Sequence, residues 1–139
     1  MALAPRTVAL FDTSVIILLP QLDDRSGLPL DAQISAITLA ELSVGPLVAR
    51  DPLKRAARQA ELVAIEELFE TVPFDSAAAR AFAQISAELR TKGKKARART
   101  FDALIAATAI ANDLPLYTAN PKDFEGIRNL TVIAVTADA

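Results

Sequence analysis

The feature that most limits the possible folds is the alternation of short apolar runs with helical segments. The run at Thr7–Phe11 is rich in β-formers and predicts a buried strand, and Val15–Leu19 then predicts a helix. Further strands are predicted at Gln33–Ile37, Leu116–Thr118 and Leu130–Val135, and Val72–Phe74 is a short strand or a connector. Strands that alternate with helices favour right-handed crossovers and a mainly parallel sheet with helices on both faces. The sequence therefore predicts an α/β fold.

The helical segments between these strands show ordinary start and stop signals. A helix is expected to begin at Thr38 and to be interrupted at Gly45-Pro46, and Pro52–Phe69 has a long helical pattern. Asp75 is expected to cap a helix that ends near Arg90. Phe101–Asn112 is apolar on nearly every side, which predicts a buried helix. With 139 residues, no repeats and no linker, the chain is expected to form one domain, residues 1–139.

Two missing residue types narrow the possible chemistry. The chain has no cysteine, so disulfides and thiolate metal sites are excluded, which is typical of a cytoplasmic protein. It also has no histidine, which excludes Ser-His-Asp triads, paired-histidine ribonuclease chemistry and histidine-bound zinc. The net charge of −2 argues against a generally basic nucleic-acid binder. No apolar run reaches the roughly 18 residues of a membrane span.

Acidic residues follow the predicted strand ends. Asp12 interrupts an apolar stretch directly after the first strand, Glu41 follows the second, and Asp123 follows Leu116–Thr118. Asp102 lies at the start of the buried helix. In parallel sheets the functional site lies beyond the carboxyl ends of the strands, so these acids are expected to meet at one edge. Clustered carboxylates repel one another, and oxygen-only clusters suit Mg²⁺ or Mn²⁺.

Each acid also has a purely structural interpretation. Thr38 and Glu41 match a capping box, and Asn120 followed by proline matches a helix N-cap with an acid in the first turn. Asp12 could cap the turn after its strand, and Asp102 could favour the positive end of its helix. Taken singly these interpretations stay open, whereas the grouping of the acids favours a metal site.

Four ordered stretches give the whole chain a family resemblance. They are "LFDTSVII", "ITLAELSVG", "RTFDALIAATAIANDLPLYT" and "TANPKDFEGI". In this order, in a chain of this length, the sequence resembles a PIN-domain ribonuclease of the VapC toxin type. The resemblance implies a three-layer α/β/α fold with about five mainly parallel strands, a homodimer and an inhibitory VapB-type antitoxin.

The resemblance also assigns roles to residues. It implies an acidic core of Asp12, Glu41 and Asp102, with Asp123 as the fourth catalytic and metal-binding acid. Ser14, Thr118 and Asn120 occupy supporting positions, and Asn120 stands where some relatives have another acid. The implied activity is hydrolysis of RNA phosphodiester bonds by a metal-activated water, with Mg²⁺ as the cofactor and Mn²⁺ able to substitute.

Two other classes of function remain as alternatives. Asp12-Thr13-Ser14 resembles the nucleophile turn of haloacid-dehalogenase-like phosphatases, but those normally carry a second acid where Ser14 stands. A PIN-like module that binds RNA or protein without catalysis is the other alternative. The presence of all three core acids argues against it.

Two stretches outside the acidic core suggest binding surfaces. The basic stretch Thr91–Arg99 precedes Asp102, and we hypothesise that it holds RNA phosphates through Lys92, Lys94, Lys95, Arg97 and Arg99, although a solvated loop would look the same. The segment from Leu39 to Phe69 has more apolar positions than one buried stripe needs, which suggests a groove for an amphipathic antitoxin segment. Those positions are Leu42, Val44, Leu47, Val48, Leu53, Leu62, Val63, Ile65, Leu68 and Phe69.

Overall fold

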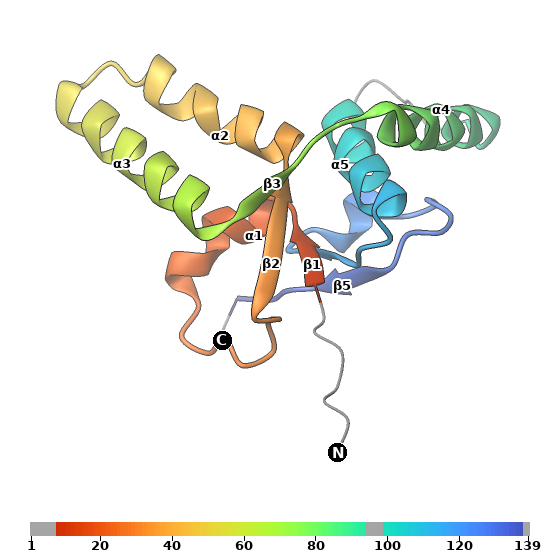
Figure 1. Cartoon of the computed structure of the whole chain (residues 1–139), viewed down its shortest axis with the longest axis horizontal. Helices are drawn as coiled ribbons and strands as arrows, with labels where there is room; N and C mark the ends of the chain where they lie inside the picture. The colour runs from red at the N-terminus through yellow and green to blue at the C-terminus, as the bar shows by residue number, and fades with distance from the viewer. Residues whose placement is uncertain (1–7, 94–98, 138–139) are drawn as a thin grey trace.

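A five-stranded parallel sheet forms the centre of the computed structural model, which describes residues 8–93 and 99–137 (Figure 1). The strands are β1 (Val8–Phe11), β2 (Asp31–Ser35), β3 (Glu70–Val72), β4 (Leu116–Thr118) and β5 (Val132–Ala134). Their order in the sheet is β3-β2-β1-β4-β5, and every neighbouring pair is parallel. The predicted parallel α/β sheet is therefore confirmed.

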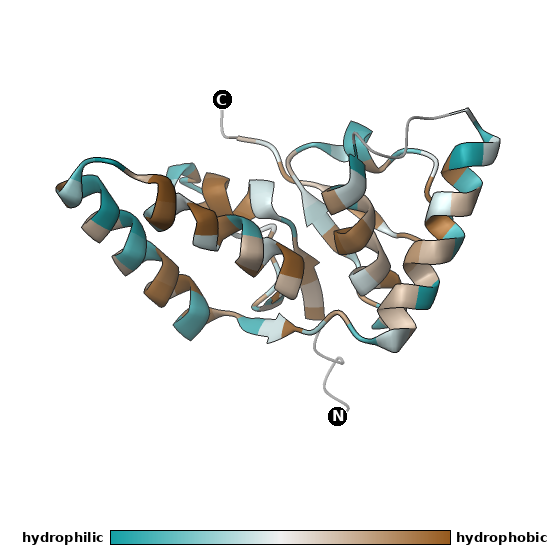
Figure 2. Cartoon of the chain, turned by 90° about the horizontal axis from the view of Figure 1, so that it is seen from above, coloured by the Kyte–Doolittle hydropathy of each residue, from teal (hydrophilic) through white to brown (hydrophobic). Residues whose placement is uncertain are grey.

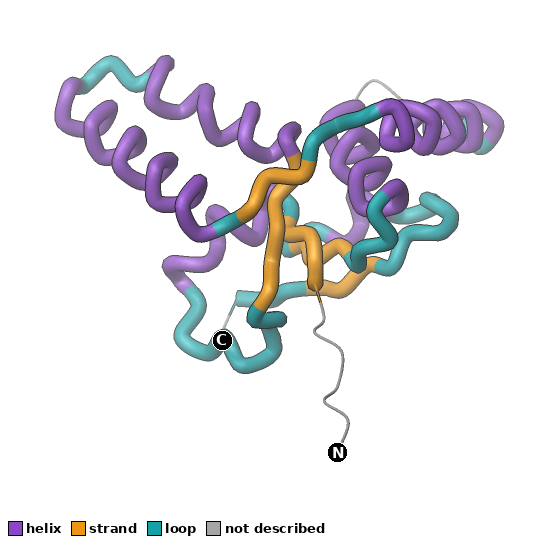
Figure 3. The backbone as a smooth tube through the Cα atoms, viewed as in Figure 1, coloured by secondary structure: helices purple, strands orange, loops and turns teal. Residues whose placement is uncertain are grey.

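Helices cover both faces of this sheet (Figure 3). They are α1 (Thr13–Leu18), α2 (Ala36–Val48), α3 (Pro52–Leu68), α4 (Ser76–Thr91) and α5 (Thr100–Ala111), with short 3₁₀ helices η1 (Leu19–Gln21) and η3 (Pro121–Phe124). Because side chains alternate along a strand, Leu10 packs with α4 and α5, whereas Ala9 and Phe11 pack with α1. Two hydrophobic cores result, one on each face, and the architecture is the expected α/β/α sandwich.

Helices α2 and α3 form a hairpin that projects away from the sheet (Figure 1). Contrary to the sequence-based expectation, α2 continues through Gly45-Pro46 and ends at Val48. A proline inside a helix removes one backbone hydrogen bond. Arginines of α3 satisfy carbonyls at this end of the helix: Arg58 donates to the Gly45 carbonyl at 3.2 Å and Arg55 to the Ala49 carbonyl at 2.8 Å. The helix thus continues past the proline, and α3 supplies donors for carbonyls at its C-terminal end.

The second strand ends two residues earlier than expected. Ser35 lies in extended backbone and its Oγ accepts a hydrogen bond from the Thr38 amide at 3.0 Å, so Ser35 is the N-cap and α2 begins at Ala36. The apolar side chains of Ala36 and Ile37, which suggested a longer strand, belong to the first turn of this helix. Among the described residues, no helix is long and apolar enough to cross a membrane.

Candidate active site

The order of the strands reverses between β1 and β4. The chain passes from β1 to β2 and β3 on one side, then returns to β4 on the other side of β1. In open parallel sheets, ligands bind at the carboxyl ends of the strands where the order reverses in this way. Asp12 directly follows β1, and Thr118 is the last residue of β4. The strand topology therefore brings the first acidic residue to the usual binding position.

Asp12 is held by its own helix and leaves one carboxylate oxygen unused. It is the N-cap of α1, and its Oδ1 accepts hydrogen bonds from the Ser14 hydroxyl at 2.6 Å and the Val15 amide at 3.1 Å. Within the described residues, no group donates to its Oδ2. Asp12 is only 4% exposed, so this acidic residue is buried, as its position within an apolar stretch suggested. Asp12 is thus both a helix cap and a carboxylate with an oxygen available for a ligand.

Ser14 and Thr118 connect this carboxylate to the end of β4. The Ser14 Oγ accepts a hydrogen bond from the Ala119 amide at 2.9 Å and lies 3.4 Å from the Thr118 Oγ1. The fully buried Thr118 hydroxyl accepts from the Asn120 amide at 3.0 Å. Both side chains therefore fix the backbone that leads to Asp123. Asn120 contributes its backbone to this turn, and its side chain makes no capping hydrogen bond.

Glu41 is oriented by a residue that the sequence did not single out. Its Oε1 accepts a hydrogen bond from the Thr13 hydroxyl at 2.8 Å, across 28 positions of the chain. The capping-box interpretation of Glu41 is wrong, because Ser35 caps α2 and Thr38 lies inside the helix. No local pattern predicts a contact over such a separation, which explains why Thr13 was missed.

The pKa of Asp102 responds to the charges of the other three acids. It lies half-buried in the first turn of α5 and accepts no hydrogen bond from the part of the chain that the structure describes. Burial raises the pKa of its carboxyl from 3.8 to about 6, and the negative charges of Asp123, Asp12 and Glu41 add to this shift. The Arg99 guanidinium opposes it. All four predicted acids therefore lie close enough to interact at the sheet edge.

This donor set fits a hard divalent cation. The available donors are carboxylate oxygens, which Mg²⁺ and Mn²⁺ prefer, and a cation would remove the repulsion that raises the Asp102 pKa. Within residues 8–93 and 99–137, no group of three or more acidic side chains is arranged to hold an ion.

The basic stretch before Asp102 is only partly described. Lys92 donates to the Gly126 carbonyl at 2.9 Å, and Arg99 lies 3.5 Å from the carbonyls of Lys122 and Asp123. Both side chains therefore contact the segment that carries the fourth acid. Lys94, Lys95 and Arg97 lie outside the described residues, so their predicted contact with RNA stays a prediction.

Comparison with known proteins identifies the class to which this fold and acidic edge belong. The family model of the PIN domain matches residues 9–130, which is most of the chain. The protein belongs to the PIN domain family.

The relatives in this family are ribonucleases. The chain is 37% identical over 130 residues to Ribonuclease VapC5 of Mycobacterium tuberculosis, which covers 89% of this chain and 93% of the relative. It is 34% identical over 127 residues to Ribonuclease VapC of Rickettsia bellii, with the same coverage of 89% and 93%. A solved structure of VapBC-5, a member of the VapBC family of toxin–antitoxin systems from M. tuberculosis, superimposes with a TM-score of 0.79 at 34% identity and covers 93% of this chain and 99% of that chain.

Proposed function

We propose that this protein is a divalent-cation-dependent endoribonuclease and the toxin of a type II toxin–antitoxin pair. The observation that carries the proposal is the meeting of Asp12, Glu41, Asp102 and Asp123 at the carboxyl edge of the sheet in a chain without histidine. Such a chain has no neutral imidazole to serve as a general base. Its similarity to VapC ribonucleases supports RNA as the substrate.

The four acids would hold Mg²⁺, for which Mn²⁺ would substitute. Asp12 would contribute its Oδ2, and Asp102 has a carboxylate that no described residue occupies. When bound, the ion would supply an activated water and neutralise the charge that builds up on the phosphate.

The chain's own residues would orient these acids. Ser14 fixes the Oδ1 of Asp12 and the backbone after β4, and Thr13 fixes the Oε1 of Glu41. The Asp102 carboxyl, with a pKa of about 6, would hold a proton in mildly acidic solution and release it when a cation offsets its neighbours' charge. The proton removed from water during hydrolysis would pass to a carboxylate or to solvent.

A VapB-type antitoxin and a second copy of the chain are the proposed protein partners. The solved structure of VapBC-5 supports the first of these, because it belongs to a toxin–antitoxin system. In this chain the exposed side chains of Leu47, Leu53 and Leu68 on the α2–α3 hairpin offer apolar surface for such a partner.

The test compares the parent protein with Asp12→Asn. Asparagine caps a helix about as well as aspartate, so the variant should stay folded and should lose cleavage by orders of magnitude. The measurement is cleavage of purified cellular RNA with Mn²⁺, Mg²⁺ or EDTA, with the new 5′ ends mapped by sequencing. Asp51→Asn is the matched control, because Asp51 also caps a helix but lies at the hairpin tip.

Two results would contradict the proposal. A folded Asp12→Asn protein that cleaves RNA at the parental rate would refute the proposed metal-dependent mechanism. A parent protein that binds RNA tightly in Mn²⁺ without cleaving it would instead support a non-catalytic binding module.

A further inference from the structure

One aromatic side chain is exposed without a structural reason. The sequence has six phenylalanines, one tyrosine and no tryptophan, all at described positions. Phe101 alone among them is exposed, with a relative exposure of 60%, whereas Phe11, Tyr117 and Phe124 are buried and the others are half-buried. Most of this residue faces solvent, so it contributes little to the core.

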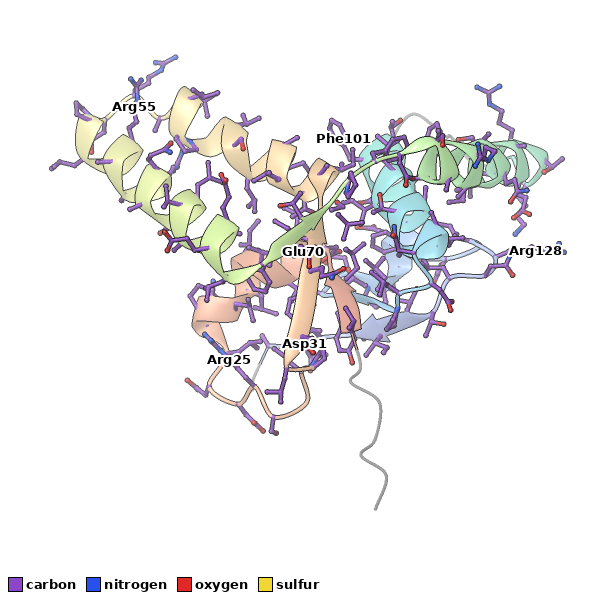
Figure 4. All side chains as sticks on the ribbon, viewed as in Figure 1. Arg25, Asp31, Arg55, Glu70, Phe101 and Arg128 are labelled. Atoms are coloured by element: carbon purple, nitrogen blue, oxygen red, sulfur yellow. The ribbon has the colours of Figure 1, made fainter. Side chains whose placement is uncertain are left out.

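The position of Phe101 relates it to the acidic edge. It lies in the first turn of α5, directly before Asp102, and Figure 4 shows it at the N-terminal end of that helix. Asp102 is the next residue of the same turn, so the ring and the carboxylate leave the helix at the same level, in directions about 100° apart. Two residues earlier, Arg99 provides a positive charge near the Asp123 backbone.

Phe101 is the one large apolar side chain that α5 exposes. The other large exposed apolar side chains within the described residues all lie at or before Leu68, on α1, before β2 and on the α2–α3 hairpin. The core of a protein interface normally consists of several adjoining apolar side chains, whereas α5 presents a single exposed ring.

We propose that Phe101 stacks against a nucleobase of the RNA, next to the bond that is cleaved. This inference rests on the proposed function and extends it to a base-binding subsite. A phenylalanine ring has a π-face and no hydrogen-bonding group, so it binds bases by stacking and tolerates different sequences. Arg99 would neutralise a neighbouring phosphate. Purines should bind better than pyrimidines because their larger rings stack more strongly.

The test measures binding in EDTA, so that no RNA is cleaved. Three fluorescein-labelled 12-nucleotide probes are used: oligo(A), oligo(U) and an abasic ribose-phosphate chain. For the parent, fluorescence anisotropy should give the tightest dissociation constant for oligo(A) and the weakest for the abasic chain. Phe101→Ala should weaken oligo(A) binding by about 5- to 100-fold, as expected for the loss of one stacked base, and should change abasic binding by less than about twofold.

Three further variants make the result specific. Phe101→Tyr should keep the difference between oligo(A) and the abasic chain, and Phe101→Leu should lose it, because leucine is apolar but cannot stack. Leu30→Ala is the matched control, since Leu30 is fully exposed just before β2, at the opposite end of the strands. It should behave as the parent does.

The outcomes separate this inference from the proposed function. If Phe101→Ala still distinguishes oligo(A) from the abasic chain, or if Phe101→Leu performs as well as the parent, stacking is refuted. Unchanged RNA binding combined with loss of self-association in size-exclusion chromatography would make Phe101 a contact between copies and would also refute it. Because binding in EDTA needs no cleavage, a parent that cuts no RNA would contradict the enzymatic proposal while the stacking result still stands or fails by itself.

Discussion

Hydroxyl groups connect Glu41 to the first turn of α2. Thr13 Oγ1 donates to Glu41 Oε1 at 2.8 Å and lies 3.1 Å from Thr38 Oγ1, which is placed as a second acceptor. A carboxylate only accepts hydrogen bonds, so the Thr13 hydroxyl is the donor that holds Glu41. The Ser35 hydroxyl donates to the Thr38 Oγ1 at 3.3 Å and accepts a hydrogen bond from the Thr38 amide. Glu41 is thereby oriented from the first turn of α2.

Replacing Thr13 should affect the reaction more than the fold. Thr13→Val removes the donor to Glu41 at nearly constant shape, and kcat/KM for RNA should fall about 10- to 100-fold, since hydrogen bonds to charged groups contribute about 1.5–3 kcal/mol. Thr13→Ser keeps the hydroxyl and should restore most of the activity. Steady-state kinetics and thermal melting of both variants provide the check. Equal activity of the valine and serine variants would show that Thr13 has no positioning role.

The raised pKa of Asp102 predicts a pH-dependent stability in EDTA. The folded protein holds the Asp102 proton up to a pH of about 6, compared with 3.8 for the ordinary group. Protonation therefore favours folding fully below about pH 4, and this contribution disappears as the pH rises through about 6. The free energy of unfolding from urea titrations should thus decline over this interval.

Asp102→Asn should flatten that part of the profile, because it removes both the proton and the charge repulsion. The variant is also expected to be more stable than the parent at pH 7 in EDTA. Identical profiles for parent and variant would show that the Asp102 carboxyl does not control stability in this range.

The acids of the site could be predicted from the sequence, but their hydrogen-bond partners could not. Asp12, Glu41 and Asp123 each follow a strand, and a parallel sheet brings strand ends together whatever its detailed packing. The bond between Thr13 and Glu41 depends on how α1 and α2 approach each other, which no local pattern records. Exposure is also a property of the folded chain, and the sequence therefore gave no sign that Phe101 differs from the other aromatics.

At the scale of elements, local signals and tertiary contacts compete. The strand predicted at Leu116–Thr118 is confirmed, and β4 has the same two ends. It is buried at every position. The break expected at Gly45-Pro46 is wrong, since α2 continues to Val48, where Arg55 and Arg58 of α3 donate to carbonyls at its end. Contacts between separate helices are recorded by no local pattern, so the sequence could not predict where α2 ends.

The hairpin of α2 and α3 should bind the proposed antitoxin. Leu47 is 78% exposed and Leu53 is 81% exposed, beside a hollow of about 450 Å³ at the hairpin tip that contains none of the four acids. Figure 2 shows hydrophobic positions on both helices. The double variant Leu47→Glu, Leu53→Glu should lose co-purification with the small protein encoded beside it while keeping ribonuclease activity. Leu30→Glu is the control and should still co-purify with the small protein. Equal co-purification of the double variant and the Leu30→Glu control would contradict the prediction.

The basic stretch between α4 and α5 should determine the salt dependence of RNA binding. Neutralising Lys94, Lys95 and Arg97 to glutamine removes three charges, so the slope of log K against log salt should become shallower by about 2 for single-stranded RNA. Fluorescence anisotropy between 50 and 300 mM KCl, roughly the range over which such contacts respond, measures it. An unchanged slope would mean that these side chains only face water.

At the scale of the whole molecule, the two cores share one sheet and should unfold together. We propose that residues 1–139 form a single domain, so calorimetry should show one cooperative transition. Mn²⁺ or Mg²⁺ should raise its midpoint, because an ion that binds only the folded state stabilises it by about 2.7 kcal/mol at a hundred times its dissociation constant. The unfolding midpoint of Asp12→Asn should rise less when either ion is added. Two separate transitions, or equal gains for parent and variant, would contradict this prediction.

The late position of β4 and η3 in the chain has a consequence for synthesis on the ribosome. The bond between Ser14 and the Ala119 amide, and the acid Asp123, become available only after the ribosome has passed β4 and η3, well after the α2–α3 hairpin. At about 5–20 residues per second, the roughly 110 residues that separate Asp12 from Asp123 take on the order of 5–20 s to add. A nascent chain therefore exposes the α2–α3 hairpin to a binding protein before it can assemble the acidic edge. For an enzyme that would attack the cell's own RNA, this timing favours binding of the hairpin by its partner before the chain can become active.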